Sequence, residues 1–502
     1  MPAYGQQLRI RRSRRVRHRV RTDRLLVDDR RGIPPLHGTP RLAARASGRA
    51  QHRRRGAFDL NAARGLVLAA PSSGSGKTTI SLGLMRAFAR RGTAVAPAKS
   101  GPDYIDPTFH AAAARRTGCN LDIWAMRPET IAASIDSLEA GADLVLCEGA
   151  MGLYDGIDAR GTGSTADLAA RAGWPVVLIV DARGLAASAG PLVAGFVGAR
   201  PDLAFAGVIF NRVGSPSHAA LLREALALAC PGVPCLGTVL RDPALALPER
   251  HLGLIPAGET DDLERFIDGA ADACVRSIDL DALAAAARPA KAASTVRRLP
   301  LAPLGMRIAI ARDSAFAFAY PAMIDEWRAA GAEISFFSPL ANEAPDATCD
   351  AVFLPGGYPE LHAGRLAQAE NFTRAMRRFQ GTIYGECGGY MTLGQGLVDA
   401  RGTRHAMLGL LPVETSFAQR RLHLGYREMR VAADCALGAA GTVLRGHEFH
   451  YASVVSEPAD TALFAVSDAR GQPRGPAGCR SGRVAGSFLH VIDRAGHSAT
   501  CG

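Results

Sequence analysis

A small-residue loop between an apolar strand and a helix constrains this chain more than any other stretch. Residues 66–70, Leu-Val-Leu-Ala-Ala, form an apolar run that predicts a buried strand. Residues 72–76, Ser-Ser-Gly-Ser-Gly, predict a tight turn, and a helix is expected to follow from Lys77 to about Arg91. Gly92 can end that helix in the left-handed conformation. Strand, glycine loop and helix in this order predict a phosphate cradle.

The cradle has the chemistry of an ATP site. Backbone N–H groups of the loop and the helix N-terminus face an anion. Lys77 adds a point charge and the Thr78 hydroxyl can ligate Mg²⁺. The standard loop has Gly six positions before the lysine, whereas this chain has Pro71, and an ordinary strand-to-helix turn is the alternative. The predicted ATP contacts in the loop are Ser75, Gly76, Lys77, Thr78 and Thr79.

Lysine usage sharpens this prediction. The chain has three lysines, Lys77, Lys99 and Lys291, against 56 arginines (59 − 3). A lysine retained in such a background is expected where a compact ammonium fits and a planar guanidinium does not. We therefore expect Lys77 and Lys99 to face phosphate, whereas Lys291 lies in a predicted linker.

Length and composition predict a cytoplasmic protein of two or three domains. The 502 residues are 48% hydrophobic, which suits globular α/β domains. No apolar run approaches the roughly 20 residues of a membrane span, and no secretory signal is recognisable. Ten cysteines without a Cys-x-x-Cys pair argue against a disulfide framework or a zinc ribbon. The sequence leaves the oligomeric state open, with a homodimer as one arrangement.

The net charge of +12 belongs to the N-terminal segment. Residues 1–56 contain 17 Arg and three Asp, a charge of +14, so the remaining 446 residues sum to −2. We expect residues 1–62 to form a disordered extension, since the segment lacks apolar periodicity. A nucleic-acid-binding arm is the alternative, but no aromatic residues are interleaved for base stacking, so no nucleic-acid partner is expected.

Alternating apolar runs predict two α/β domains. The first is expected over residues 63–285 and the second over residues 305–496, with a Pro- and Ala-rich linker over 286–304. Continuously apolar runs are typical of parallel strands covered on both faces. The predicted strands are 66–70, 94–98, 144–148, 176–180 and 207–211 in the first domain, and 307–311, 333–337, 351–354 and 382–385 in the second.

A nucleophile elbow is predicted in the second domain. The strand at 382–385 runs into Gly385-Glu386-Cys387-Gly388-Gly389, a turn that lifts the Cys387 thiol clear of a sheet. The Gly388 amide can then help to hold an oxyanion. His490, after a short strand pattern, is the expected base, and Gly356 and Gly357 form a second loop where backbone amides can approach an oxyanion or a substrate. A buried structural cysteine, a core histidine and a plain turn are the alternatives.

These motifs together resemble the cobyrinic and hydrogenobyrinic acid a,c-diamide synthases. The resemblance rests also on Gly-Pro-Asp-Tyr-Ile-Asp-Pro at 101–107, on residues 148–156 and on Gly-His-Glu-Phe-His-Tyr at 446–451. It spans about residues 65–495, and Pro71 is usual in this family. It implies a dethiobiotin-synthetase-like P-loop domain followed by a class I glutamine amidotransferase domain. It also implies glutamine, ATP and a corrin ring acid as substrates, with no membrane partner.

The resemblance implies roles for further residues. Thr78 and Glu148 are the expected Mg²⁺ ligands, and Lys99 an expected ATP contact. Asp103, Asp106 and Asp155 match the family's acidic residues at the substrate site, although capping and loop acids are the alternative from the residues alone. Asn211 matches an adenine-reading position of related P-loop enzymes. Ile492 stands where many amidotransferases have a third catalytic residue, and Asp493 would point differently, so no third member is expected.

Two other functions remain as alternatives. A cobyric acid synthase shares both domain types but amidates other side chains of the ring. A ParA- or MinD-like ATPase would leave the amidotransferase domain unexplained, and residues 70–76 lack the early lysine of that class. The motifs at 70–73, 249–254 and 423–427 look closer to the cobalt-free branch of the family, although no residue need touch the metal in the ring.

Overall fold

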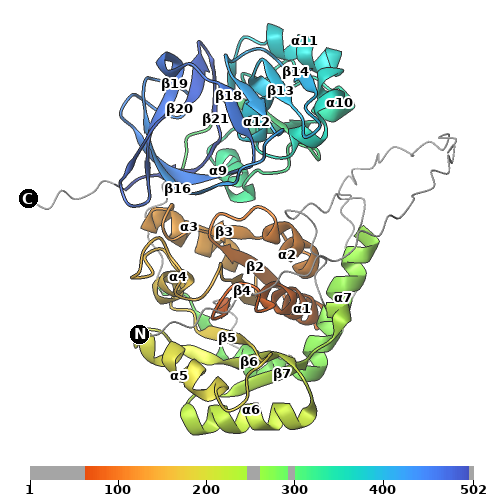
Figure 1. Cartoon of the computed structure of the whole chain (residues 1–502), viewed down its shortest axis with the longest axis vertical. Helices are drawn as coiled ribbons and strands as arrows, with labels where there is room; N and C mark the ends of the chain where they lie inside the picture. Colours follow the sequence, from red (N-terminus) through yellow and green to blue (C-terminus); the bar gives the residue numbers. More distant parts are fainter. Residues whose placement is uncertain (1–62, 246–259, 292–299, 497–502) are drawn as a thin grey trace, which may run out of the picture. The chain divides into compact units, whose positions relative to one another are not determined.

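The computed structural model describes residues 63–245, 260–291 and 300–496, and for residues 260 and 261 the backbone only. The Arg-rich stretch 1–62 and the motif at 249–254 lie outside these ranges, as does the linker segment 292–299. We call residues 63–291 the N-terminal lobe and residues 300–496 the C-terminal lobe (Figure 1). Both are built on parallel sheets.

The sheet of the N-terminal lobe has the strand order β3-β2-β4-β1-β5-β6-β7. All the neighbours along this path pair in parallel, and the short β8 pairs antiparallel with the start of β1. The central β1 therefore delivers the phosphate loop between β4 and β5. The strands are β1 Arg64–Ala69, β2 Val95–Ser100, β3 Cys119–Leu121, β4 Leu144–Glu148, β5 Val176–Asp181, β6 Phe205–Val213, β7 Cys235–Leu240 and β8 Arg288–Pro289.

Helices cover both faces of this sheet (Figure 1). Along β1, Val67 and Ala69 contribute to the core beneath α3, α4, α5 and α6, while Leu66 and Leu68 pack under α1, α2, α7 and α8. Burial on both faces explains why these strands are apolar throughout. The helices are α1 Lys77–Arg90, α2 Asp106–Ala114, α3 Pro128–Glu139, α4 Thr165–Ala172, α5 Ala189–Ala199, α6 Pro216–Ala229, α7 Thr260–Ser277 and α8 Leu280–Ala286, with the 3₁₀ turn η1 Pro243–Leu245.

The C-terminal lobe combines a mixed sheet with a small one. The large sheet runs β10-β9-β11-β12-β21-β20-β19-β16-β17-β22, and the small one runs β14-β13-β15-β18. Only the β10-β9-β11-β12-β21 part of the large sheet is parallel. The strands are β9 Arg307–Ala311, β10 Glu333–Phe337, β11 Ala351–Leu354, β12 Thr382–Glu386, β13 Gly396–Val398, β14 Arg404–Ala406, β15 Glu414–Ser416, β16 His423–Val431, β17 Val443–His450, β18 Ser453–Ser456, β19 Ala462–Asp468, β20 Pro473–Ser481, β21 Val484–Ser487 and β22 Leu489–Arg494.

Short helices cover the parallel part of that sheet. Side chains of α10, α11 and α12 form one core with β9, β11 and β12, while α9 packs on the opposite face with β16, β17 and β22. Trp124 and Ala125 of the N-terminal lobe belong to this second core. The elements are α9 Pro321–Ala329, η4 Pro339–Ala341, η5 Pro359–Leu361, α10 Ala363–Ala367, α11 Glu370–Arg378, α12 Gly388–Leu393 and η6 Ala459–Thr461.

The α/β class is confirmed, and each predicted strand overlaps an observed one. Three strands of the first sheet, β3, β7 and the short β8, were not predicted. β3 has three residues and carries the polar Asn120, and β7 opens with Cys235, so neither shows a long apolar run. The predicted linker begins inside the lobe, because Arg288 and Pro289 pair with β1.

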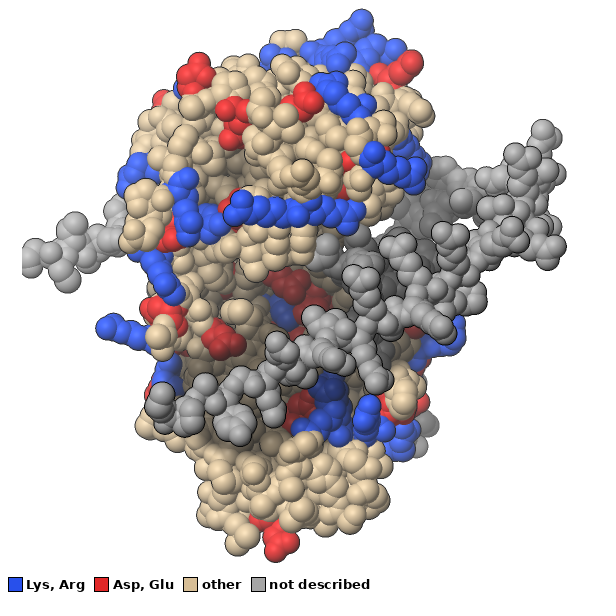
Figure 2. All heavy atoms as spheres, viewed as in Figure 1, with Lys and Arg blue, Asp and Glu red and all other residues tan. Residues whose placement is uncertain are grey.

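The described helices include none that is long and apolar enough to cross a membrane. Figure 2 shows one face of the molecule, on which acidic and basic side chains are intermixed. This mixture agrees with the near-neutral charge of the chain beyond residue 56.

Candidate functional site

The phosphate loop follows β1 and leads into α1 as predicted. Gly74 and Gly76 have φ values of 78° and 83°, a backbone region that glycine enters without strain. The Ser75 hydroxyl donates to the carbonyl of Ser72 across the turn, at 2.8 Å. The helix starts at Lys77, so its free N–H groups face the loop.

Lys77 lies under the loop and is only 8% exposed. Its Nζ donates to the carbonyl oxygen of Met151 at 3.1 Å, within the 148–156 motif. Met151 itself has a φ of 48°, so the motif turns sharply beside the lysine. Burial lowers the pKa of Lys77 below its usual value, although the Glu148 carboxylate opposes that shift.

Glu148, at the carboxyl end of β4, receives side chains from three elements. Thr78 Oγ1 donates to its Oε1 at 2.7 Å, and Lys99 Nζ lies 3.1 Å from the same oxygen. His110, from α2, donates through Nε2 to Oε2 at 2.7 Å. Glu148 is fully buried, so the sequence-predicted Thr78, Lys99 and Glu148 meet in one buried cluster.

The charges in this cluster stabilise one another. Burial alone would raise the pKa of Glu148, but the Lys99 ammonium and the His110 hydrogen bond hold it well below its usual range. Burial would likewise lower the pKa of Lys99, and the Glu148 and Asp106 carboxylates raise it instead. Glu148 and Lys99 are therefore ionised at neutral pH.

The oxygen atoms of this cluster suit a hard cation. Thr78 Oγ1 and Glu148 Oε1 converge at 2.7 Å at the start of α1. Hydroxyl and carboxylate oxygens are the ligands that Mg²⁺ takes beside nucleotide phosphates. The donor set therefore fits the predicted Mg²⁺ site.

The three acidic residues of the predicted substrate site occupy different positions. Asp106 pairs with Lys99, and burial together with the nearby Glu148 raises its pKa to about 6. Asp103 accepts the backbone N–H groups of Ile105 and Asp106 at 2.7 and 3.2 Å. Asp155 accepts the N–H of Gly152 at 2.8 Å. Each orders a loop beside the cluster.

Asn211 and Thr79 contact other segments of the lobe. Asn211 is buried and donates through Nδ2 to the carbonyl of Ser75 at 3.0 Å, so it holds the phosphate loop. Thr79 Oγ1 reaches the carbonyl of Leu245 at 3.4 Å. Arg212, which no sequence motif indicated, has a φ of 57° and donates to the Gly74 carbonyl at 2.6 Å. Adenine reading by Asn211 stays a prediction.

The elbow at Cys387 has the strained geometry that its sequence predicts. Cys387 follows β12 with φ 47° and ψ −101°, and α12 starts at the next residue. Positive φ is costly for a residue with a side chain and is characteristic of nucleophile elbows. The Cys387 N–H donates to the Ser487 carbonyl at 2.8 Å, which fixes the elbow to β21.

The predicted glycine loops meet at this elbow. A Cβ added at Gly356 would lie 2.6 Å from His490 Cε1 and 3.4 Å from Cys387 Cβ. A Cβ added at Gly388 would lie 2.9 Å from the backbone nitrogen of Gly357. The structure therefore brings Gly356, Gly357, Gly388, Cys387 and His490 together in a space that only glycine leaves open.

His490 lies fully buried on β22 beside the thiol. Its Nδ1 lies 3.2 Å from the Tyr104 hydroxyl and 3.7 Å from Glu386 Oε2. Its Nε2 has no hydrogen-bond partner among the described residues. Burial would lower the pKa of His490, but the neighbouring Cys387 thiol and Glu386 carboxylate raise it to about 9. The raised pKa keeps His490 an imidazolium at neutral pH, beside the Cys387 thiol.

Two residues of these sites were missed in the sequence. Glu386 is buried, precedes the nucleophile directly, and places its Oε2 3.7 Å from Nδ1 of His490. Its position in the Gly385–Gly389 motif was the available signal. His110 lies four residues after Asp106 on α2, the spacing that puts two side chains on one helix face.

Asp493 serves another purpose, in agreement with its expected direction away from His490. It is fully buried and accepts from Arg127 Nε at 3.0 Å and from the Arg127 backbone N–H at 2.9 Å. The Thr130 hydroxyl donates to it at 2.5 Å. Asp493 therefore connects β22, the strand of His490, to the start of α3 in the N-terminal lobe.

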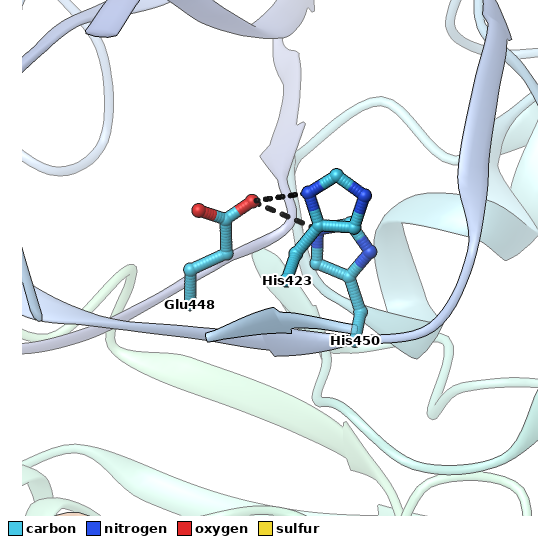
Figure 3. A group of neighbouring side chains, drawn as sticks. All are labelled: His423, Glu448 and His450. Atoms are coloured by element: carbon cyan, nitrogen blue, oxygen red, sulfur yellow. Dashed lines mark hydrogen bonds and ion pairs between the residues drawn. The ribbon is translucent and has the colours of Figure 1, made fainter. Parts of the chain in front are cut away.

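His423, Glu448 and His450 form a group that could offer three ligand atoms to a metal, all within 4.8 Å of one another (Figure 3). The carboxylate is already engaged, since His450 Nε2 contacts Oε1 at 2.9 Å and Arg427 contacts Oε2 at 2.7 Å. These partners hold the pKa of Glu448 at about 2, against burial, which raises it. The group is therefore a charge-balanced cluster, and a cation would have to displace His450 or Arg427.

Comparison with known proteins gives two matches to family models. Residues 66–255 match a CobQ/CobB/MinD/ParA nucleotide-binding domain, and residues 307–496 match a CobB/CobQ-like glutamine amidotransferase domain. These matches agree with the order of the two lobes.

Curated relatives match almost their whole length. Hydrogenobyrinate a,c-diamide synthase from Brucella abortus biovar 1 (strain 9-941) is 54% identical over 442 residues, which cover 87% of this chain and 100% of that protein. The enzyme of the same name from Mesorhizobium japonicum is 51% identical over 437 residues, 86% of this chain and 99% of that protein. The one from Rhizobium meliloti (strain 1021) is 53% identical over 432 residues, with the same coverage.

Proposed function

The chain belongs to the hydrogenobyrinate a,c-diamide synthase family, and we propose that it amidates the a and c carboxylates of hydrogenobyrinic acid with ATP and glutamine. The observation that supports this most is the presence of two complete sites in one chain. The Cys387–His490 pair can release ammonia, and the Lys77–Thr78–Glu148 cluster can activate a carboxylate.

In the glutaminase half, the Cys387 thiolate attacks the side-chain amide carbon of glutamine. The N–H of Gly388 and the Gly356–Gly357 loop hold the oxyanion of the tetrahedral intermediate. The His490 imidazolium gives its proton to the leaving nitrogen, and ammonia departs as the C–N bond breaks. Water then hydrolyses the glutamyl thioester, releasing glutamate and restoring the thiolate.

In the synthetase half, an oxygen of the ring carboxylate attacks the γ-phosphorus of ATP, and ADP leaves. Ammonia then attacks the acyl carbon, and the C–O bond to phosphate breaks as the amide forms. Lys77 faces the β/γ-phosphates and Lys99 faces the transferred phosphoryl group, where positive charge lowers the barrier. Thr78 and Glu148 would hold Mg²⁺, which would supply further charge neutralisation.

His110 and Asp106 are positioning residues in this half. His110 fixes Glu148 through Oε2, while Oε1 accepts from Thr78 and Lys99. Asp106 holds Lys99, so its carboxylate sets where the ammonium points. Asp103 and Asp155 shape the neighbouring loops, and we propose that these loops receive the ring acid.

A pocket beside the elbow fits the amino-acid end of glutamine. Its lining includes Arg421, His450, Glu457 and Phe488 around a cavity of about 330 Å³. Glu457 accepts from Tyr390, three residues after the nucleophile. Arg421 suits the α-carboxylate of glutamine and Glu457 suits its α-ammonium group. Arg421→Ala should raise KM for glutamine and leave ammonia-driven synthesis unchanged, and an unaltered KM would contradict this placement.

Cobyrinic acid, which contains cobalt, is the second candidate substrate. The names of the matched relatives favour the cobalt-free acid. A coupled assay offers both ring acids with ATP and glutamine and reads the products by mass spectrometry. We expect two amidations of hydrogenobyrinic acid at the higher kcat/KM. Further amidations would instead support a cobyric acid synthase.

A further inference from the structure

One loop of the N-terminal lobe enters the glutaminase site of the C-terminal lobe. Tyr104, between β2 and α2, places its hydroxyl 3.2 Å from Nδ1 of His490. Its ring stacks on Tyr320 with centroids 4.3 Å apart, and on Phe318 at 5.2 Å. The Tyr320 hydroxyl in turn donates to the Pro102 carbonyl at 3.0 Å. The loop is therefore packed firmly against the catalytic histidine.

The same loop is anchored at the phosphate cluster. Asp106, two residues after Tyr104, pairs with Lys99, which contacts Glu148. Asp103 accepts the N–H groups of the two residues after Tyr104, and Asn120 donates to the carbonyls of Gly101 and Asp103 at 2.8 and 2.7 Å. These bonds tie the loop at both ends of the Asp103–Asp106 stretch, so Tyr104 lies between two anchored positions.

Among the side chains around His490, Tyr104 makes the nearer contact with Nδ1. Cys387 and Glu386 come from the β12–α12 elbow, and the His447 ring of β17 stacks at 4.8 Å. Glu386 is 3.7 Å from Nδ1, so the Tyr104 oxygen, at 3.2 Å, is the nearer acceptor for the Nδ1 proton. A bond at Nδ1 orients the ring so that Nε2 faces the thiol.

We propose that Tyr104 is a positioning residue for His490 and couples glutamine hydrolysis to occupancy of the ATP and ring-acid site. When phosphate and carboxylate groups engage Lys99, Asp106 and its loop move, and the Tyr104 hydroxyl adjusts the imidazole. Ammonia is then released when an acyl phosphate can consume it. This inference rests on the proposed function and adds a route between its two sites.

The test uses full-length Tyr104→Phe, which keeps the stacked ring and removes only the hydroxyl. Glutamate release is measured with glutamine alone and with ATP, Mg²⁺ and hydrogenobyrinic acid added, beside ammonia-driven synthesis. We expect the stimulated glutaminase kcat to fall about tenfold or more, as for loss of a hydrogen bond to a charged group, with KM for glutamine little changed. The ratio of stimulated to unstimulated rates should fall towards one.

Tyr426→Phe is the matched control. Its hydroxyl also links the lobes, donating to Asp122 at 2.8 Å, but the described contacts of that hydroxyl do not include His490. We expect this variant to keep the wild-type ratio. If the substitutions only loosen the contact between the lobes, the ratio of stimulated to unstimulated rates will fall equally in both variants. That outcome would contradict the proposal.

A pH profile separates positioning from a purely structural role. The hydroxyl accepts the Nδ1 proton of the imidazolium, so its loss should move the basic limb of the glutaminase profile to lower pH. An unmoved limb together with a retained stimulation ratio in Tyr104→Phe would overturn both the positioning role and the coupling, and would leave the proposed function standing. Absence of glutaminase activity in the wild-type protein would instead contradict the proposed function, and the coupling with it.

Discussion

Substituting Gly356 by Ala should disable the glutaminase site without unfolding the lobe. The added Cβ would lie 2.6 Å from Cε1 of His490, whereas ordinary contact begins at 3.4 Å. The imidazole would therefore have to move by about 0.8 Å (3.4 − 2.6), since the added Cβ is also crowded by Phe318 Cβ at 3.2 Å. Gly356 has no positive φ, so alanine adds no backbone strain there.

The expected cost follows from that displacement. A misplacement of about 1 Å in a catalytic group typically lowers a rate about 10²-fold. We therefore expect kcat for glutamine-dependent synthesis to fall about 10²-fold in Gly356→Ala. Synthesis driven by high ammonia at raised pH should stay near the wild-type rate, because the phosphate cluster is untouched.

Gly364→Ala provides a matched control in the same lobe. Its added Cβ would lie 3.5 Å from Cε1 of another histidine, His405, which is ordinary contact. Gly364 lies in α10, where alanine is favoured over glycine. We expect unchanged activity in this control. Wild-type glutaminase in Gly356→Ala would refute the packing of the glycine loop against His490.

Three other perturbations test separate parts of the structure. Lys77→Arg and Lys99→Arg should each lower ammonia-driven synthesis about 10²- to 10³-fold in turnover assays, because a planar guanidinium does not fit beside Met151 or Glu148. The control is Lys291→Arg, which should keep wild-type turnover; the Nζ of Lys291 donates to the Ala170 carbonyl. Equal rates in all three variants would contradict the lysine assignment. Asp493→Asn breaks the buried ion pair with Arg127 and should lower the free energy of unfolding by about 3–5 kcal/mol in calorimetry. Glu414→Gln, which breaks the half-exposed pair with Arg404, is the control and should change little. Equal losses of stability in both variants would show that burial does not make the Asp493 pair stronger. The pKa of His490 is raised from its ordinary value of 6.5 to about 9, so the stabilisation that the imidazolium gains from its neighbours is fully present below pH 6.5 and is lost as pH rises through 9. Glutaminase kcat should therefore fall above pH 9 in a rate profile. A flat profile to pH 10 would argue against an imidazolium acid.

Local patterns predicted the parts of the fold that a single element determines. The phosphate loop, the elbow at Cys387 and the apolar parallel strands are each read from a few adjacent residues. The glycine positions at the elbow were also predictable, because a turn that carries a nucleophile needs glycine on both sides.

Contacts between distant segments could not be predicted from the sequence. Glu386 lies next to the predicted nucleophile, yet its approach to His490 depends on how β22 lies against β12 and β17. The Tyr104 contact joins residues 386 positions apart. Asp493 could be excluded as a third catalytic member from its strand position, but its partners on α3 could not be named without the packing of the lobes.

Most strands from β13 to β22, which pair largely antiparallel, were missed for a different reason. Many carry polar or half-exposed residues, as in β16, where only Met429 and Val431 are fully buried. Such strands lack the long apolar runs by which covered parallel strands are recognised. Pairing with neighbours rather than local composition defines them.

Cys387→Ser with both nitrogen donors tests the central claim most directly. Products from hydrogenobyrinic acid and ATP are followed by mass spectrometry with glutamine or with ammonia as the donor. We predict that the variant loses glutamine-dependent amidation and keeps ammonia-dependent formation of the diamide at a rate close to wild type. Survival of both reactions would show that another residue is the nucleophile, and loss of both would contradict the separation of glutaminase and synthetase sites.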